Sequence, residues 1–259
     1  MRFDGSGPLS WCCAMHPDLL AFLIIVLVVG GAAFVVGLTQ WLPERARRRA
    51  LGQLARRLGM RYALSDPSVA ARYDSLSVLG DDPHAVATNV LVGTYRGHRL
   101  CAFDFYPLGR QILCYKSRRE APAFTVFVLE QEQRFPRLRI YPETAASKLA
   151  QALGYEDIDF ESVEFSEAFC VRSPDRKFAF DVCHPRMMTY LLRHRDMIVE
   201  FADDCIALCL DAHPPERHRV EAIPYWLKRL ITIRKLLPGY LFEQQEGGRR
   251  AVESAGQNP

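Results

Sequence analysis

One uninterrupted apolar run, from Leu19 to Leu42, constrains this chain more than any other feature of its sequence. The run contains no charged residue. A helix rises about 1.5 Å per residue, so a run of this length covers the ~30 Å hydrocarbon core of a bilayer. A cleaved signal peptide has a shorter apolar region, of about 7 to 15 residues. We therefore predict a retained transmembrane helix at residues 19–42, after a short extracytoplasmic N-terminus at residues 1–18.

The charges on either side of the run predict its orientation, because lysines and arginines near a span stay on the cytoplasmic side. Residues 44–61 hold seven arginines and one acid, a net charge of +6, whereas residues 1–43 carry −1. We expect the N-terminus outside the cell membrane and the C-terminal part in the cytoplasm. A basic juxtamembrane helix is expected within residues 43–61, with Gly59 as its end. The arginines expected at the membrane surface are Arg45, Arg47, Arg48, Arg49, Arg56 and Arg57.

The basic segment also accounts for the positive charge of the whole chain. The full sequence carries a net charge of +3. Once the charges of the two N-terminal segments are subtracted, residues 62–259 carry −2 and are close to neutral. Domains that bind nucleic acid through their charge are strongly basic, so the sequence argues against a nucleic-acid partner. The arginines are expected to act as an orientation signal, with recognition of specific lipids as the alternative.

Strand patterns follow the basic segment. The strongest lies at residues 87–106, where two runs rich in β-branched and aromatic residues flank Arg96-Gly97 and predict a hairpin. With two further runs, this hairpin predicts an antiparallel meander of four strands. The other strands are expected at residues 61–64, 111–118, 123–129, 170–172, 197–201 and 205–210, the last two joined as a hairpin by Asp203-Asp204.

Helical periodicity appears between and after the strand patterns. Strands in runs, followed by helices and without regular βαβ alternation, favour an α+β fold with a mainly antiparallel sheet and packed helices. The last helix is expected to cover the sheet, the alternative being a helix lying on a membrane surface. The expected helices lie at residues 69–73, 145–153, 185–194 and 215–237.

The domain plan follows from these patterns. We expect a cytoplasmic α+β domain at residues 62–242, large enough for one sizeable core. The repeated order of hairpin and helix suits either a single unit or two halves, 62–154 and 155–242. Residues 243–259 lack periodicity and large apolar groups, and are expected to form a disordered tail.

Eight cysteines raise the question of disulfides or metal binding. Six of them fall in the predicted cytoplasmic part, where thiols are kept reduced. None forms a CxxC pair, so we interpret them as buried thiols.

The chain contains none of the common phosphate, dinucleotide, hydrolase or zinc signatures. Two features remain. Asp104 lies in a strand between two phenylalanines, and the segment 156–167 alternates carboxylates with apolar residues. Carboxylates suit hard cations, but the segment lacks the register of a calcium loop, so we interpret it as a solvated edge and expect no metal and no cofactor. The candidate surface consists of Asp104, Tyr106, Glu156, Asp157, Asp159 and Glu164.

Two stretches carry a resemblance to other proteins. The first runs from Asn89 to Gly93 and on through Phe103-Asp104-Phe105-Tyr106, and the second from Asp157 to Phe169. They resemble a group of bacterial membrane-anchored proteins in which a short span precedes a cytoplasmic α+β domain. The resemblance implies an architecture, and it implies no activity and no site residues.

These observations lead to one functional hypothesis and two alternatives. We expect a membrane-anchored cytoplasmic domain that binds a protein or lipid partner without catalysis. One alternative is a hydrolase-like enzyme at the membrane that uses Asp104 or the acidic segment 156–167. A homodimer through the transmembrane helix is the other, because Gly30, Ala33 and Gly37 share a helix face and small residues let spans pack closely.

Overall fold

The computed structural model describes residues 17–79, 86–106, 124–143, 157–211 and 219–242. Several expected elements lie outside these residues: the N-terminus at 1–16, the strand at 111–118, the helix at 145–153, and the tail at 243–259. The chain divides into two compact units, Met1–Arg47 and Arg48–Pro259.

The first unit is the helical N-terminal part of α1, a helix that extends from Pro17 to Leu58. The described apolar side chains near its start are exposed, with Leu27 77% and Phe22 61% accessible. Most other side chains of residues 19–42 lie outside the described set. Within the described residues, no helix has the length and hydropathy of a membrane span.

The second unit begins with the last turns of α1, which pack on a hydrophobic core through the buried Leu51 and Ala55. The helix ends as expected at Gly59, whose φ of +69° lies in the left-handed region that glycine tolerates. The amide of Met60 then donates to the carbonyl of Ala55, at 2.9 Å. The chain then enters the first strand of the sheet at Arg61.

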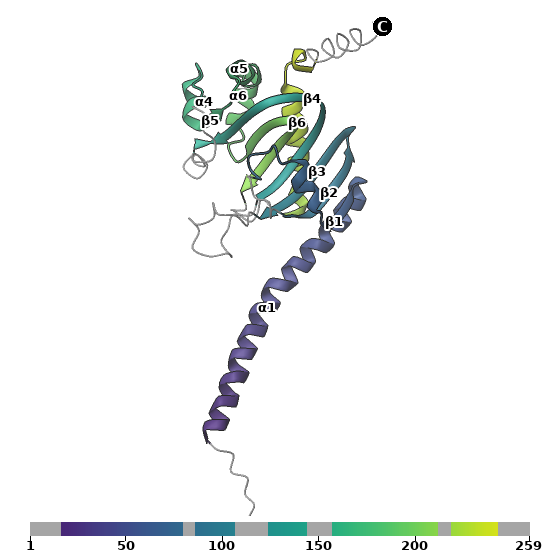
Figure 1. Cartoon of the computed structure of the whole chain (residues 1–259), viewed down its shortest axis with the longest axis vertical. Coiled ribbons are helices and arrows are strands. Elements are labelled where there is room, and N and C mark those ends of the chain that lie inside the picture. The colour runs from purple at the N-terminus through teal and green to yellow at the C-terminus, as the bar shows by residue number, and fades with distance from the viewer. Residues whose placement is uncertain (1–16, 80–85, 107–123, 144–156, 212–218, 243–259) are drawn as a thin grey trace, which may run out of the picture. The chain divides into compact units, whose positions relative to one another are not determined.

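Six strands of the described residues form one sheet, and every pairing in it is antiparallel. The expected α+β class with a mainly antiparallel sheet is therefore confirmed. Figure 1 shows β4 and β6 as its long central strands. The strands are β1 (Arg61–Ser65), β2 (Val86–Tyr95), β3 (His98–Tyr106), β4 (Phe124–Pro142), β5 (Phe169–Arg172) and β6 (Ile198–Asp211).

Strand β4 organises the sheet. The order along one path is β1-β2-β3-β4-β5, and β6 pairs with β4. The beginning of β4 pairs with β3, from Phe124 to Leu129, and its end pairs with β5, from Arg139 to Pro142. The hairpin expected at residues 87–106 is present as β2 and β3, and its turn has positive φ at Arg96 and Gly97.

Two expectations about strand ends were wrong. The expected hairpin at residues 197–210 is instead one strand, β6, and the strand expected to stop at residue 129 continues to Pro142. In both cases polar residues form an irregularity within a strand and not a turn. Asp203 has a φ of +46°, and the β4–β6 register shifts between Glu130 and Leu138. Bulges and turns favour similar polar residues, so local sequence does not separate them.

Helices cover one face of this sheet, which we call the α7 face. Helix α7 packs against β4 and β6 and buries Trp226, Leu227 and Leu230, as expected for a helix that covers the sheet. Leu51 and Ala55 of α1 belong to the same core. After α1, the helices among the described residues of this unit are α2 (Pro67–Arg72), α4 (Val163–Ala168), α5 (Arg176–Val182), α6 (Pro185–Leu192), the 3₁₀ helix η3 (Val220–Ala222) and α7 (Ile223–Leu236).

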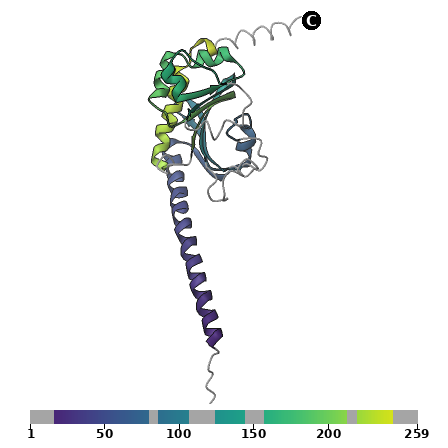
Figure 2. The same cartoon turned by 90° about the vertical axis from the view of Figure 1, so that its left-hand side faces the viewer.

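The segment 66–79, which includes α2, covers part of the opposite face, which we call the α2 face. Tyr73 stacks on Phe103 of β3, with ring centroids 6.2 Å apart. Leu76 and Leu79 are buried in the same cluster. Figure 2 shows the curved sheet with α7 on one side and α2 on the other.

Replacement of Phe201 by alanine is expected to destabilise the α7-face core. Its buried ring makes edge contacts with Phe135 and Phe178, each at 5.9 Å between centroids. Phe-to-Ala changes in a core cost about 3–5 kcal/mol, because they remove apolar burial and leave a cavity. Urea denaturation of the full chain in mild detergent measures this loss. Phe180, which is 45% exposed, is the matched control. A Phe180→Ala loss as large as that of Phe201→Ala would contradict the packing described.

Candidate functional site

Asp104 has a structural position in the sheet. Its side chain is buried, at 6% exposure. Its carboxylate accepts hydrogen bonds from Nδ2 of Asn89 on β2, at 2.9 Å, and from Oγ1 of Thr125 on β4, at 2.7 Å. Asn89 in turn accepts from the hydroxyl of Tyr62 on β1, at 2.9 Å. These hydrogen bonds link four strands.

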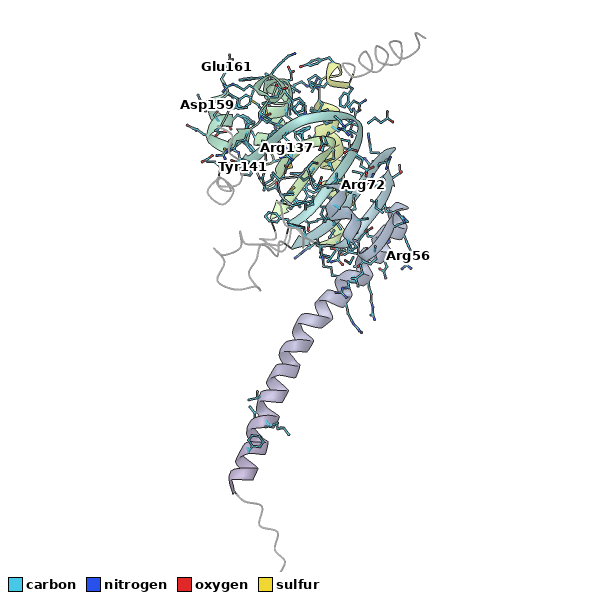
Figure 3. All side chains as sticks on the ribbon, viewed as in Figure 1. Arg56, Arg72, Arg137, Tyr141, Asp159 and Glu161 are labelled. Carbon is cyan, nitrogen blue, oxygen red and sulfur yellow. The ribbon has the colours of Figure 1, made fainter. Side chains whose placement is uncertain are left out.

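The described carboxylates of the acidic segment also form structural hydrogen bonds or an ion pair, or are exposed to solvent. Oδ1 of Asp157 accepts from the amides of Ile158 and Val171, at 3.0 and 2.7 Å. Asp159 is exposed, and Figure 3 shows it near α4 and β5. Glu164, whose side chain is 70% exposed, pairs with Arg195 at 3.0 Å. Glu156 and the side chain of Tyr106 lie outside the described residues.

The structure does not bring Asp104 and the described acidic segment together. Asp104 is paired with Thr125 near the beginning of β4. Asp157 forms a bridge with Arg172, which is opposite Arg139 near the end of β4. Within the described ranges, no group of three or more His, Cys, Asp or Glu side chains is placed to hold a metal. The hydrolase-like arrangement that would join these carboxylates is therefore absent from the described part of the chain.

The six arginines expected at the membrane surface all lie on α1. Arg45, Arg49, Arg56 and Arg57 are exposed, and Arg47 and Arg48 are half-buried. Figure 3 shows Arg56 near the end of the helix, pointing away from the sheet.

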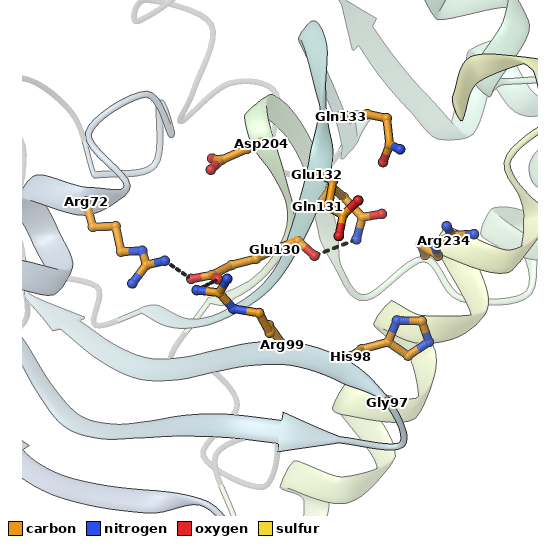
Figure 4. Close-up of a pocket in the computed structure, with 10 residues that line it drawn as sticks. All are labelled: Arg72, Gly97, His98, Arg99, Glu130, Gln131, Glu132, Gln133, Asp204 and Arg234. Carbon is orange, nitrogen blue, oxygen red and sulfur yellow. Dashed lines mark hydrogen bonds and ion pairs between the residues drawn. The ribbon is translucent and has the colours of Figure 1, made fainter. Parts of the chain in front are cut away.

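A charged cavity of about 330 Å³ lies where β4 bends, within the second unit. Its walls come from α2, the β2–β3 turn, β4, β6 and α7, as Figure 4 shows. Residues far apart in the sequence therefore meet there. They are Arg72, Gly97, His98, Arg99, Glu130, Gln131, Glu132, Gln133, Asp204 and Arg234.

Glu130 is the central residue of this cavity. Its side chain is only 10% exposed and pairs with Arg72, at 2.7 Å, and with Arg99, at 2.8 Å. The hydroxyl of the buried Tyr73 donates to the same carboxylate, at 2.8 Å. Figure 4 shows the two arginines converging on it from opposite sides. Charge-assisted hydrogen bonds of this kind are the stronger ones, so Glu130 fixes two cations at the cavity wall.

The irregular stretch of β4 creates this cavity. Glu130 is opposite Cys205, whereas Phe135 is opposite Asp203, so β4 has more residues than β6 between these pairs. A bulge bends its strand and re-aims side chains. The polar side chains of this stretch consequently line the cavity and are not packed in the apolar clusters on the two faces of the sheet. They are Gln131, Glu132 and Gln133.

Burial shifts the pKa values of three titratable groups near Glu130. Burial raises the pKa of Tyr73, and the neighbouring Cys101 and Glu130 raise it further. Burial also raises the pKa of the Cys101 thiol to about 12. The pKa of His98 is lowered by burial and by the cations Arg234 and Lys235. A thiol or hydroxyl acts as a nucleophile when its pKa is lowered or a base lies beside it, whereas burial raises the pKa values of Tyr73 and Cys101.

Sequence reasoning missed Glu130 and its two arginines. The available signal was the polar stretch Glu130–Gln133, directly after an apolar run, which we interpreted as the end of a strand. The partners Arg72 and Arg99 come from separate elements and carry no pattern of their own. The buried thiols, in contrast, are as expected: Cys101, Cys170, Cys183, Cys205 and Cys209 are free and buried.

Comparison with known proteins gives one solved structure of similar fold. No family model matches the chain, and no curated protein sequence matches it. The similar structure is the crystal structure of the mycobacterial trehalose monomycolate transport factor A, with a TM-score of 0.52 and 15% sequence identity. The match covers 75% of this chain and 97% of that one. At this identity the likeness shows a shared fold.

Replacement of Glu130 by glutamine is expected to lower the free energy of unfolding by about 1–2 kcal/mol. The change leaves Arg72 and Arg99 without their shared counter-charge and weakens the hydrogen bond from Tyr73. Thermal denaturation of the full chain checks it. Glu132→Gln is the matched control, because Glu132 lines the same cavity but is exposed, and its effect should stay within about 0.5 kcal/mol. Equal effects of the two changes would refute a central role for Glu130.

Proposed function

We propose that this chain is a membrane-anchored binding protein that takes part in lipid transport at the cytoplasmic face of a bacterial cell membrane, without catalysis. The observation that carries the proposal is the shared fold with a trehalose monomycolate transport factor, of which the match covers 97%. The match extends over 75% of this chain and is therefore not confined to one short motif. The charge and hydropathy of the N-terminal helix support the same role.

The anchor would be residues 19–42. Their uncharged sequence is long enough to cross a bilayer as a helix, and their backbone is helical. The described side chains Phe22, Leu27 and Val28 are 60% or more exposed. Exposed apolar side chains over successive turns are unfavourable in water and favourable in lipid. This transmembrane placement is part of the proposal.

The arginines that follow the anchor would set its orientation. A basic side chain near an anionic leaflet contributes about 1 kcal/mol. Four of the six arginines on residues 45–57 are exposed, so the C-terminal domain would lie on the cytoplasmic side. The bilayer itself is then one partner, and the domain is held close to the lipids or proteins that it binds.

Binding without catalysis fits the chemistry of the described site. Glu130 is held by two arginines and Tyr73, so its carboxylate is committed to ion pairs. Burial raises the pKa of Cys101 and Cys205 to about 12, which keeps these thiols protonated and unreactive. Polar cavities with fixed charges recognise partners by complementarity.

Deletion of residues 19–42 is expected to move the chain from the membrane fraction to the soluble fraction. The intact chain should resist alkaline carbonate extraction, because a spanning helix is held by its whole apolar surface. Its C-terminus should be cleaved by protease in inverted vesicles and protected in intact spheroplasts. Replacing residues 19–42 with an unrelated apolar sequence of equal length is the control and should preserve both results. Extraction of the intact chain by carbonate would overturn the anchor.

Purification of the detergent-extracted chain is expected to enrich one lipid class or one membrane transport protein. Mass spectrometry of bound lipids and proteins measures the enrichment. The control is residues 1–61 fused to an unrelated soluble protein, which retains the anchor and the basic segment but lacks the domain. Identical lipids and proteins bound to both would show that the domain contributes no binding, and the proposed function would fail.

A further inference from the structure

Arg139 is a buried cation whose hydrogen-bonding groups are unused. It lies on β4, opposite Glu200 of β6 and Arg172 of β5, and is 3% exposed. Among the residues that the structure describes, none of its three guanidinium nitrogens has a hydrogen-bond partner. Burying a charged group without hydrogen bonds is strongly unfavourable. A guanidinium presents five N–H donors in a rigid fork, so Arg139 offers an unusually large unused donor capacity inside the domain.

Two neighbouring side chains share this feature. Glu200 is 2% exposed, and its Oε1 accepts from the amide of Ser77, at 2.6 Å. Its other oxygen, Oε2, has no hydrogen-bond partner in the described part of the chain, and neither does the buried hydroxyl of Ser77. Arg139, Glu200 and Ser77 therefore place donors and one acceptor together. Native proteins leave few buried polar groups unpaired, and a cluster of them needs an explanation.

An aromatic ring and a second arginine lie close to Arg139. Its guanidinium carbon lies 5.7 Å from the ring centroid of Tyr141, and that of Arg172 lies 5.9 Å from the same ring. The cluster comprises two arginines and Glu200, and the backbone of Asp157 forms a β-bridge with Arg172. Asp157 is already committed to two backbone amides. The cation that remains for a ligand is Arg139.

We infer that Arg139, Ser77 and Glu200 form a buried binding site for a phosphate group that carries neighbouring hydroxyl groups, as in a polyol phosphate. The planar fork of Arg139 matches two oxygens of one phosphate. The hydroxyl of Ser77 donates to the same group, whereas Oε2 of Glu200 accepts from a hydroxyl of the ligand. An anion without hydroxyl groups would leave Glu200 unpaired, so both parts of the ligand are needed.

The phosphate can come from a lipid headgroup or from a soluble polyol phosphate. Both present the same chemistry to Arg139 and Glu200. The site goes beyond the proposed function, because it would hold even in a chain that is not anchored in a membrane. If the chain is extracted by carbonate, the proposed anchor fails and the proposed phosphate site is unaffected. If the ligand titration fails, the phosphate site fails and the anchor is unaffected.

Isothermal titration calorimetry of the full chain in nonionic detergent tests the site with stated probes. The soluble probes are inorganic phosphate and glycerol phosphate, and the lipid probe is phosphatidylglycerol in mixed micelles, with phosphatidylcholine as its reference. The chain should bind glycerol phosphate more tightly than inorganic phosphate if the source is soluble. It should bind phosphatidylglycerol in preference to both if the source is a lipid. Binding of none of these probes would overturn the inference.

Arg139→Met should weaken binding of the preferred probe at least about tenfold, because it removes a bidentate charged contact. Arg137→Met is the matched control: Arg137 lies on the same strand but is exposed, and affinity should change less than about twofold. Arg139→Lys, which retains the charge and loses the fork, should also weaken binding about tenfold and serves if the methionine variant does not fold. Wild-type affinity in Arg139→Lys or Arg139→Met would overturn the site.

Discussion

Strand β4 pairs with β6 along most of its length, from Phe124 opposite Asp211 to Ile140 opposite Val199. Every other strand reaches the sheet through the remaining edge of β4: β3, followed by β2 and β1, at its beginning, and β5 at its end. Helix α7 packs on the same two strands. The β4–β6 ladder is thus the common support of both hydrophobic clusters, and a change that separates these strands would remove the partner of almost every other element.

The irregularity in this ladder has a consequence for both faces of the sheet. On β4, Val126 and Val128 face the same cluster as Tyr141, although 128 and 141 differ by an odd number of positions. On β6, Ala202 and Cys205 share that cluster with the same change of phase. In both strands, the side chains that face this cluster change from even to odd positions, or the reverse, at the same bend. Each strand therefore contributes buried side chains to the cluster before and after the bend. Glu130 lies just before the bend, and Arg139 lies after it.

This switch explains what could and what could not be predicted from sequence. The hairpin at residues 87–106 and the helix end at Gly59 were predictable, because both depend on local patterns and on glycine conformation. The strand end predicted at residue 129 and the turn predicted at Asp203-Asp204 were wrong, since a change of phase in a strand resembles a turn when no partner strand is known.

The polar contacts were less predictable still. The hydrogen bond from Tyr73 to Glu130 joins residues 57 apart, and that from Ser77 to Glu200 joins residues 123 apart. No local pattern encodes such pairs. Asp104 was recognised as notable for a local reason, a charge between two aromatic residues, but its partners depend on the pairing of three strands.

The hydrogen bonds of Asp104 favour one register of those strands over the others. Successive residues of a strand point to opposite faces, so a slip of β3 by one position would turn its carboxylate away from Asn89 and Thr125. The charge would then be buried against apolar groups without its donors, which is far more costly than losing ordinary apolar contacts. Misaligned sheets are thereby selectively penalised, and this protects a meander whose β-branched residues would otherwise pair in more than one alignment.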